Sequence, residues 1–462
     1  MYLMIPNDAR KLLERLYPSG AWTCQPEDLV AYGFDAAAAA PEHAPEAVGF
    51  PTTVDQVSAS MRLANEYRFP VTPRGAGTGA VGASVPIHGG MALILTRMNR
   101  ILEIDTNNLT ALVEPGLVTG KFQEEVEKLG LFYPPDPASL HVSTLGGNVA
   151  MGSGGPRAVK YGVTRDYVLG MEVVLPDGSV INTGAKTIKS VVGYDLTRLM
   201  VGSEGTLGIA TKIRLRLIPK PVALRTAVAS FAQVSDAARA VAAIIGARII
   251  PSVLELMDRG SVRAVEKLLK TGLPDASLLL IETDGSERQA TEEMAMIETI
   301  LRERGAEGVR TASTLEDRAL LWKARRSMSQ ATSMLAPDKI NEDVAVPRSR
   351  IPDLVARLEE LSERSGVTIL SFGHAGDGNM HVNILTDKSD PQRYTIAQEV
   401  VEEVFRITLE LGGTLSGEHG IGLAKAKYIE SEIGERGVEI TRAIKKLFDP
   451  NNILNPGKII PE

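Results

Sequence analysis

Three of the six histidines in this 462-residue chain stand in two short polar motifs near the C-terminus. His374 and His381 lie seven positions apart in FGHAGDGNMHVN, around a Gly-Asp-Gly turn, and His419 lies in SGEHGIG. The pattern predicts strands over residues 367–372 and 380–385, joined by a loop that brings both imidazoles to one end. Two imidazoles and one carboxylate commonly bind a divalent metal that keeps open positions for substrate.

Glu418 can supply that carboxylate. Its neighbour His419 then points elsewhere, because successive side chains alternate in extended backbone, and this leaves His419 available as a base. Paired histidines on a polar hairpin also occur as hydrogen-bonded surface residues, so the two motifs alone leave both interpretations open.

The segment PRGAGTGAVGAS, residues 73–84, has the composition of an anion-binding loop, because small residues let backbone amides approach a phosphate closely. Its G-x-G-x-x-G spacing requires a helix directly afterwards to indicate a Rossmann site. Pro86, Gly89 and Gly90 would break such a helix, so that site is disfavoured. No Gly-Lys-Ser/Thr follows, which excludes a Walker loop, and a glycine-rich turn without a ligand remains an alternative.

A second segment, residues 140–163, is also rich in Gly and Ser and poor in core-forming residues. Such backbone is typical of a chain wrapped around a ligand. Each of the two loops follows a predicted strand. Together they could hold one large ligand from two sides.

The elements that must position these motifs follow from local patterns. Thr53 and Gln56 have capping-box spacing, so a helix is expected to begin there and to end before Pro70. The segments MALILTRM and LTALVEPG predict buried strands, and Asp177-Gly178 predicts a hairpin turn.

The chain is too long for a single ordinary core, since chains beyond roughly 250–300 residues usually divide. The sequence pattern changes at Pro219 and Pro221. After these residues, predicted strands alternate with predicted amphipathic helices, as in an α+β domain. We therefore expect domains over residues 1–221 and 222–415, followed by a C-terminal segment, 416–462, that returns to the first domain.

Composition narrows the class of protein. The net charge is −7 without a long basic run, so no nucleic-acid partner is expected. The only cysteine, Cys24, excludes an internal disulfide and fits a reducing compartment. The N-terminus is too charged for a signal peptide, and no apolar run approaches the ~20 residues of a membrane span. We expect a cytoplasmic protein without direct membrane insertion; membrane association through a partner stays open.

Six motifs, in order, resemble one family. PVTPRGAGTGAVG, STLGGNVAMGSGGPRAVKYG and GYDLTRLMVGSEGTLGI resemble the FAD-binding domain of the vanillyl-alcohol oxidase superfamily, the PCMH type. GHAGDGNMHVNIL, GGTLSGEHGIG and LFDPNNILNPGK resemble the C-terminal region of FAD-linked oxidases, and both regions occur together in the D-lactate dehydrogenase, glycolate oxidase flavin subunit and D-2-hydroxyglutarate dehydrogenase group. The resemblance implies an α+β fold: a two-part PCMH-type FAD domain with an inserted ferredoxin-like α+β cap domain.

The resemblance also assigns cofactor residues, in the two loops, near the ring or adenine and in the C-terminal segment. They are Arg74, Gly75, Ala76, Gly77, Thr78, Gly79, Gly82, Pro135, Asp136, Ser139, Thr144, Gly146, Gly147, Asn148, Gly152, Ser153, Gly154, Gly155, Val163, Ile209 and Asn455. Some relatives tether FAD to a histidine in the first loop. This loop has none, so FAD is expected to be non-covalent, with Cys24 and His141 the remaining tether candidates.

For the histidine motifs, the resemblance implies that His374, His381 and Glu418 bind Zn²⁺, Mn²⁺ or Fe²⁺ and that His419 is the catalytic base. It places Arg325 at the arginine that binds the substrate carboxylate, a task that suits a guanidinium fork. Tandem arginines also commonly form a solvated helix face.

Lys339 is a further candidate for the substrate carboxylate, and Asn383 lies on the His381 face of its strand. A structural hydrogen bond explains Asn383 equally well. The acidic Glu342 and Asp343 stand where hydroxyglutarate enzymes carry a lysine–tyrosine–aspartate stretch, which favours a monocarboxylate such as D-lactate or glycolate.

The implied reaction is metal-assisted oxidation of a small 2-hydroxy acid, with proton removal by His419 and hydride transfer to flavin N5. Electrons would pass to an iron–sulfur subunit or an electron-transfer flavoprotein, because one cysteine cannot hold a cluster. A homodimer is compatible with this. The alternatives are a D-2-hydroxyglutarate dehydrogenase, a flavin-dependent synthase and an electron-relay subunit that oxidises no hydroxy acid.

Overall fold

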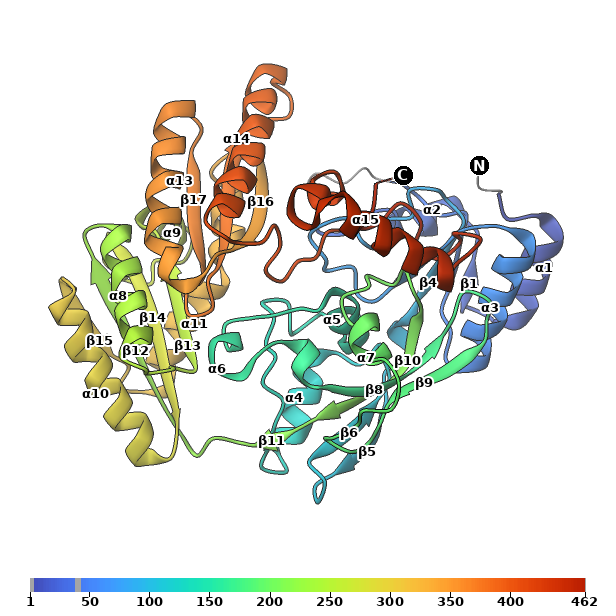
Figure 1. The fold of residues 1–462 in the computed structure, drawn as a ribbon, viewed down its shortest axis with the longest axis horizontal. Helices are drawn as coiled ribbons and strands as arrows, with labels where there is room; N and C mark the ends of the chain where they lie inside the picture. The colour runs from blue at the N-terminus through green and yellow to red at the C-terminus, as the bar shows by residue number, and fades with distance from the viewer. Residues whose placement is uncertain (1–3, 38–42, 462) are drawn as a thin grey trace. The chain divides into compact units, whose positions relative to one another are not determined.

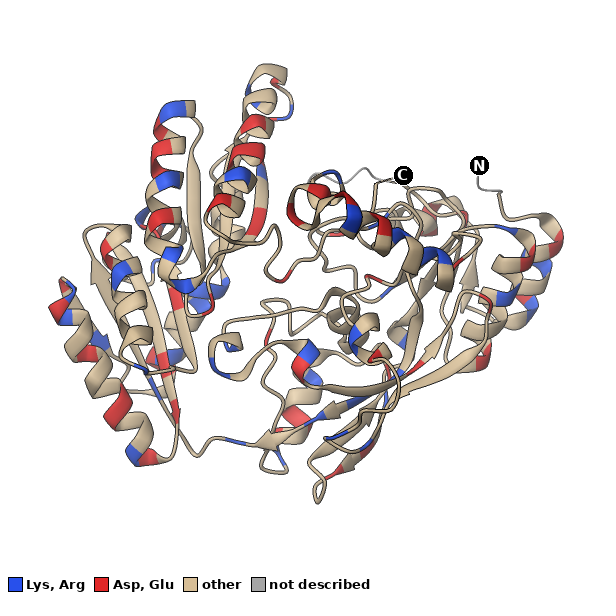
Figure 2. Ribbon diagram, in the orientation of Figure 1, with Lys and Arg blue, Asp and Glu red and all other residues tan. Residues whose placement is uncertain are grey.

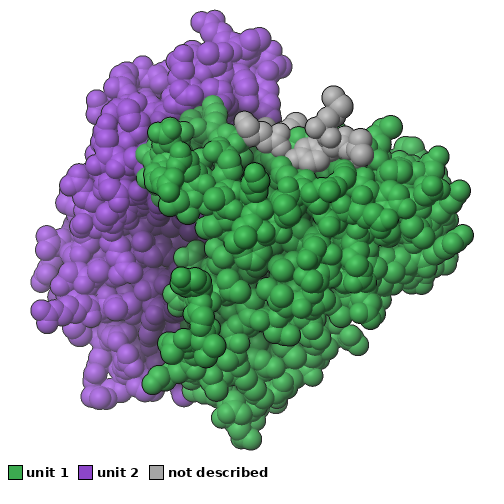
Figure 3. All heavy atoms as spheres, turned by 45° about the vertical axis from the view of Figure 1, so that its right-hand side comes forward, with its two compact units in different colours: residues 1–153, 163–220, 419–462 green, residues 154–162, 221–418 purple. Residues whose placement is uncertain are grey.

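The structure is a computed structural model that describes residues 4–37 and 43–461, and the chain divides into two compact units, coloured separately in Figure 3. Unit 1 contains residues 1–153, 163–220 and 419–462. Unit 2 contains residues 154–162 and 221–418. Unit 1 is therefore built from both ends of the chain. The grouping of the short segment 154–162 with unit 2 had no signal in the sequence.

The first sheet of unit 1 has the strand order β1-β2-β4-β3, with parallel pairing of β2, β4 and β3. Its strands are β1 (Trp22–Thr23), β2 (Ala47–Gly49), β3 (Val71–Arg74) and β4 (Met91–Ile94). The helices in this part of the chain are α1 (Asn7–Leu16), α2 (Pro26–Leu29) and α3 (Val54–Tyr67). No helix lies between β3 and β4, so the prediction that the glycine loop does not open a Rossmann helix is confirmed.

The start of α3 confirms the predicted cap with one change. Thr53 Oγ1 accepts a hydrogen bond from Gln56 N at 3.3 Å, as expected. The Gln56 side chain, however, accepts from the backbone of Thr52 at 2.8 Å and not from Thr53, because it reaches one residue further back. The helix ends at Tyr67, before Pro70, with Arg68 in the left-handed conformation.

The second sheet of unit 1 is antiparallel, in the order β5-β6-β10-β8-β9. Its strands are β5 (Ile101–Asp105), β6 (Thr110–Val113), β8 (Val168–Val174), β9 (Val180–Gly184) and β10 (Ile209–Arg216). Val174 pairs with Val180 across a turn in which Gly178 has φ +81°, so the predicted hairpin is confirmed. The remaining α-helices and strands of unit 1 are α4 (Thr119–Glu127), β7 (Leu131–Phe132), α5 (Leu145–Met151), α7 (Leu196–Met200), β11 (Ile218–Pro219) and α15 (Ile429–Phe448).

The C-terminal segment packs into unit 1. Buried side chains from α4, α5 and α7 cover the second sheet, and Ile444 and Phe448 of α15 pack against the same core. Beyond α15, Ile453 O accepts a hydrogen bond from Val71 N at 2.7 Å, and Asn455 N donates to Val71 O at 2.8 Å. The chain end thereby extends the first sheet beside β3.

Unit 2 contains one antiparallel seven-stranded sheet in the order β15-β12-β14-β13-β17-β18-β16. Its strands are β12 (Ala223–Phe231), β13 (Val253–Met257), β14 (Ser277–Gly285), β15 (Gly308–Thr311), β16 (Asp338–Ala345), β17 (Ile369–His374) and β18 (Asn379–Thr386). Its helices are α6 (Ala158–Tyr161), α8 (Val234–Gly246), α9 (Arg259–Leu269), α10 (Glu287–Glu303), α11 (Leu315–Arg326), α12 (Met328–Ser333), α13 (Ile351–Ser365) and α14 (Pro391–Glu410).

The sheet of unit 2 contains the predicted ferredoxin-like arrangement twice. Strands β12 to β15 stand in the spatial order fourth, first, third, second, which is the ferredoxin-like order. In the second half, β16, β18 and β17 take the places of the first, third and second strands of this arrangement. An isolated bridge between Ala345 of β16 and Thr414 marks the place of the fourth strand. The two halves meet where β13 pairs with β17. The sequence carries no visible repeat, so this duplication is a feature of topology alone.

Helices cover both faces of this sheet. Leu321, Trp322 and Met328, from α11 and α12, share a core with Leu280 and Phe372 of the sheet. Helices α8, α10, α13 and α14 cover the other face (Figure 1). Figure 2 shows both signs of charge interspersed along α10, α13 and α14, as on helix sides that face solvent.

Within residues 4–37 and 43–461, no helix combines the length and the apolar character that a bilayer crossing needs.

A buried carboxylate joins the chain end to the middle of unit 1. Glu204 accepts hydrogen bonds from Ile421 N at 2.7 Å and Gly422 N at 2.8 Å. Burial raises the pKa of Glu204 to about 7, although both amides and the charges of Lys458 and Lys425 act in the opposite direction. In the folded protein Glu204 therefore binds its proton more tightly than in the unfolded chain.

We expect the unfolding free energy to fall as pH rises from about 5 to 8, because ionising Glu204 costs the folded state alone. One pKa unit corresponds to about 1.4 kcal/mol, so this group contributes a loss of about 3 kcal/mol. Chemical denaturation of the wild type and of Glu204→Gln across this range measures the effect. The loss should be smaller by that amount in the variant; identical pH profiles would contradict the assignment.

Candidate functional site

The hairpin of β17 and β18 brings the two predicted histidines together in unit 2. His374 is the last residue of β17, and His381 lies opposite Phe372 in the paired strand. The ring centroids of His374 and His381 are 5.2 Å apart, with the planes nearly perpendicular. The connecting turn needs Gly378, which has φ +98° and would collide with Val346 O if it carried a Cβ. The expected convergence of the imidazoles is therefore present.

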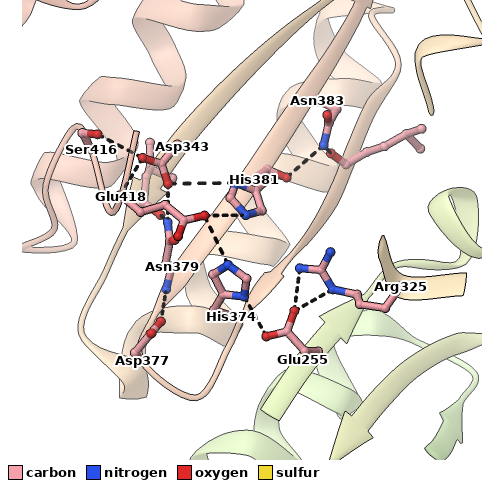
Figure 4. Close-up of polar contacts among 12 residues, drawn as sticks. Glu255, Arg325, Asp343, His374, Asp377, Asn379, His381, Asn383, Ser416 and Glu418 are labelled. Atoms are coloured by element: carbon pink, nitrogen blue, oxygen red, sulfur yellow. Dashed lines mark hydrogen bonds and ion pairs between the residues drawn. The ribbon is translucent and has the colours of Figure 1, made fainter. Parts of the chain in front are cut away.

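Glu418 completes this group, as Figure 4 shows. Its Oε1 lies 3.3 Å from His374 Nε2 and 3.5 Å from His381 Nε2. Both imidazoles thus direct the same ring atom at one carboxylate oxygen. His419 follows directly in the chain and is the first residue of the C-terminal part of unit 1.

Asp343, for which the sequence predicted only an effect on substrate charge, holds the segment that carries Glu418. Its Oδ2 accepts hydrogen bonds from Glu418 N at 2.9 Å and Ser416 Oγ at 3.0 Å, and its Oδ1 accepts from Asn379 Nδ2 at 2.6 Å. The distance from Asp343 Oδ1 to His381 Nδ1 is 3.9 Å, beyond hydrogen-bond length. Carboxylate or imidazole atoms of Asp343, His381 and Glu418 lie within 4.8 Å of one another.

A second buried carboxylate, Glu255 of β13, lies on the other side of His374. Its Oε1 is 2.7 Å from His374 Nδ1. Its Oε2 accepts from Arg325 Nε at 2.6 Å, and Arg325 Nη2 is 2.5 Å from the same oxygen. The signal for Glu255 was a single acidic residue inside the apolar strand VLELM, where a charge requires a partner.

The acidic surroundings favour a cation at the imidazoles. Burial by itself lowers the pKa of His374, but the negative charges of Glu255 and Glu418 outweigh it and hold the pKa well above its usual value. Burial also acts to raise the pKa of Glu255, and the positive charges of Arg325 and His374 reverse this effect and lower it. The carboxylates of Glu255, Glu418 and Asp343 lie around the two imidazoles, and the Arg325 guanidinium pairs with Glu255 alone among them, so the group suits either protonated imidazole or a metal ion.

Arg325, Lys339 and Asn383, the predicted substrate contacts, are all engaged within unit 2. Arg325 is buried in the Glu255 ion pair with its guanidinium over the Phe372 ring, and is not on a solvated helix face. Lys339 Nζ donates to Ser329 O at 2.8 Å, and burial lowers its pKa to about 8.

Asn383 donates through Nδ2 to the carbonyls of His381 and Leu370, at 3.1 and 3.3 Å. Its Oδ1 is buried, and nothing in the described chain donates a hydrogen bond to it. The amide nitrogen is fixed by two carbonyls, so the oxygen is the atom left for a ligand or water.

The two predicted cofactor loops touch in unit 1. A Cβ on Gly75 would collide with Thr144 Oγ1, so the first loop can pass the second only with glycine there. Thr144 Oγ1 also accepts from Gly147 N at 3.3 Å and caps α5. Asn455 Nδ2 donates to Ala83 O at 2.9 Å, which ties the C-terminal segment to the end of the first loop.

These loops fit a large cofactor. Asn455 is 1% exposed, and its Nδ2 donates to the backbone carbonyls of Ala83 and Glu204. Its Oδ1 has no hydrogen-bond partner among the described residues. Gly77 and Gly82 have positive φ, a conformation that favours glycine, and the absence of a side chain lets backbone amides approach a ligand closely. A cofactor with many acceptor atoms and at least one donor would use both features.

Other predicted cofactor residues have identified local roles. Arg74 Nη1 donates to Phe34 O at 2.7 Å, Pro135 O accepts from Gln123, and Asn148 Nδ2 bonds Thr119 at 2.7 Å. The Ile209 side chain lies in the core of the first sheet.

The other residues predicted to bind the cofactor divide between the two units. Those in unit 1 lie in the two loops or near them in sequence: Ala76, Thr78, Gly79, Asp136, Ser139, Gly146, Gly152, Ser153 and Val163. Gly154 and Gly155 belong to unit 2.

Comparisons with known proteins show what the two parts of the chain are similar to. Residues 45–184 match the model of an FAD binding domain, and residues 220–459 match the C-terminal domain of FAD linked oxidases. The chain is 45% identical over 417 residues to glycolate oxidase subunit GlcD of Bacillus subtilis, covering 90% of this chain and 89% of that one. It is 38% identical over 427 residues to D-lactate dehydrogenase of Anaerostipes hadrus, with 90% and 89% covered.

Among solved structures, p-cresol methylhydroxylase with substrate bound aligns with TM-score 0.83 and 21% identity, covering 98% of this chain and 97% of that chain. This likeness concerns the fold.

We expect Gly79→Ala to weaken FAD binding about tenfold or more while the unfolding free energy of the cofactor-free protein changes by less than about 0.5 kcal/mol. Among the described residues, the nearest atom to a Cβ there is Asp35 Oδ2 at 3.8 Å, so the added methyl meets none of their atoms closely and is expected to obstruct a ligand. Fluorescence titration of the cofactor-free protein with FAD measures it. Gly246→Ala, whose added Cβ meets no atom of residues 4–37 or 43–461 within 4 Å, is the control; unchanged affinity in Gly79→Ala would remove this loop from the FAD site.

Proposed function

We propose that this chain, which belongs to the family of FAD-linked oxidases and is an FAD-linked oxidoreductase, oxidises a small 2-hydroxy acid, D-lactate or glycolate, to the 2-oxo acid. The convergence of His374 Nε2 and His381 Nε2 on Glu418 Oε1 carries the proposal. Relatives named for glycolate oxidation and D-lactate dehydrogenation support the substrate class.

His374, His381 and Glu418 would hold a divalent cation, Zn²⁺, Mn²⁺ or Fe²⁺. Two imidazole nitrogens and a carboxylate oxygen are suitable donors for these ions and leave positions for a chelating substrate. The acidic groups around the imidazoles add electrostatic support. FAD would be bound without a covalent link by the loops of unit 1 and Asn455.

When bound, the metal would lower the pKa of the substrate hydroxyl, and FAD would supply a hydride acceptor at N5. We assign to His419 the removal of the hydroxyl proton, because it is the next residue after the ligand Glu418 and its imidazole is a suitable base. The hydroxyl proton goes to His419, and the Cα hydrogen leaves as hydride with its electron pair. The carbon–oxygen double bond that forms gives the 2-oxo acid.

Arg325 and Lys339 are the proposed contacts for the substrate carboxylate, and Asn383 Oδ1 is a proposed acceptor for a substrate donor. The excess of carboxylates around the imidazoles would repel a second substrate carboxylate. This charge balance supports a monocarboxylate over 2-hydroxyglutarate.

The reduced flavin requires an acceptor beyond this chain. Cys24 is the only cysteine, so an iron–sulfur cluster would belong to a partner subunit. The relative from Bacillus subtilis is named a subunit, which supports a complex. An iron–sulfur subunit or an electron-transfer flavoprotein is the proposed partner.

The first test is the visible spectrum of the FAD-loaded protein without oxygen, before and after D-lactate, L-lactate or glycolate. We expect the oxidised flavin bands to bleach with D-lactate or glycolate. In His419→Ala the bleaching rate should fall by about 10²–10⁴, the usual contribution of a positioned base. Bands that persist with all three acids would contradict the substrate class, and normal bleaching in His419→Ala would remove the base.

The metal site is tested separately by elemental analysis. We expect His381→Ala to lose stoichiometric metal, since two remaining ligands hold a divalent ion poorly. His43→Ala, which alters an exposed histidine of unit 1, should keep the wild-type content. Equal metal content in both variants would exclude His381 as a ligand.

A further inference from the structure

The geometry points to Glu255, held by Arg325, as the residue that orients His374 for metal binding, a role that nothing in the sequence motifs assigns. This inference rests on the proposed metal site and specifies how it is supported. Glu255 is then a positioning residue, which acts on the metal through an imidazole, and Arg325 orients Glu255 in addition to its proposed contact with the substrate carboxylate.

The contact with Glu255 determines which ring nitrogen of His374 carries the proton. Glu255 Oε1 lies 2.7 Å from Nδ1, and an ionised carboxylate can only accept hydrogen bonds. In the neutral ring the proton is therefore on Nδ1, and the lone pair is on Nε2. That is the atom directed at Glu418 Oε1. Glu255 thus selects the tautomer that a metal shared with Glu418 requires.

The orientation of Glu255 is set in turn by Arg325. Nε and Nη2 of Arg325 both lie at Oε2, which leaves Oε1 to His374. The Arg325 side chain is 8% exposed and that of Glu255 is 0% exposed, so neither group reorients into water. The guanidinium also lies over the Phe372 ring, 5.0 Å from its centroid. One carboxylate oxygen of Glu255, Oε2, therefore contacts Arg325, and the other, Oε1, contacts His374.

Asp343 lies too far from His381 to orient that ring in the way that Glu255 orients His374. Asp343 Oδ1 is 3.9 Å from His381 Nδ1, whereas its hydrogen bonds go to Asn379, Ser416 and the backbone of Glu418. Asp343 therefore positions the segment of Glu418, and Glu255 positions a ring. Loss of Glu255 should affect the metal directly.

A second ion pair in the same unit provides a matched control. Arg318 lies seven residues before Arg325 on α11, and its Nε is 2.8 Å from Oε1 of Glu282, a buried carboxylate on the adjacent strand β14. Glu282 also accepts from Trp322 and Thr226, and no histidine is among these contacts. Removing Glu282 should disturb unit 2 about as much as removing Glu255, without releasing a metal ligand.

The experiment measures metal affinity in the full-length, FAD-loaded protein after removal of metal, by titration with Co²⁺ and Mn²⁺ without substrate. We expect Glu255→Ala to bind 10–100-fold more weakly than wild type, with an altered Co²⁺ absorption spectrum. Glu255→Gln should be intermediate, because its amide oxygen can still accept from Nδ1. Arg325→Met should also weaken binding, although no substrate is present. Glu282→Ala should match wild type.

Two results would overturn the inference while the metal site stands: wild-type affinity in Glu255→Ala, or equal losses in Glu255→Ala and Glu282→Ala, which would indicate general destabilisation. Failure of wild type itself to bind either ion would instead remove the proposed metal site, and the role of Glu255 with it. Bleaching of the flavin by hydroxy acid tests the proposed oxidation and is measured separately from these metal titrations.

Discussion

The pairing of β13 with β17 is the contact on which the site in unit 2 depends. It joins the two ferredoxin-like halves through Leu256 opposite Gly373 and Met257 opposite Phe372. The backbone bond from Gly376 N to Leu254 O, 3.0 Å, extends the junction beyond the strands. This register places Glu255 against His374, and because side chains alternate, a slip of one strand by one residue would turn one of the two to the opposite face of the sheet.

The junction also explains why charged groups can be buried there. Glu255 has no exposed surface, and an unpaired carboxylate in such a place would be strongly destabilising. Arg325 reaches it from α11, and His374 reaches it from the neighbouring strand. The arrangement combines one half of the sheet, the other half and a helix between them, so its geometry follows from the packing of all three.

Unit 1 uses a different principle, in which backbone rather than charge defines the site. Gly75 allows the first loop to lie against Thr144, and the C-terminal segment enters through Asn455 and the bond to Val71. Glu204 then holds the chain at Ile421 and Gly422. Three segments far apart in the sequence are thereby fixed around glycine-rich backbone, which is how a large cofactor can be held by main-chain groups.

The sequence by itself determined the elements with local causes: the cap of α3 at Thr53, the hairpin at Gly178, the absence of a helix after the first loop, and the family. It also predicted that His374 and His381 converge, because a short turn between strands leaves little choice. Only the tertiary structure decided that Arg325 is paired with Glu255, that Asp343 holds the segment of Glu418, and that the ferredoxin-like arrangement occurs twice. These facts depend on strands and helices distant in sequence, and no local pattern specifies which buried carboxylate meets which cation.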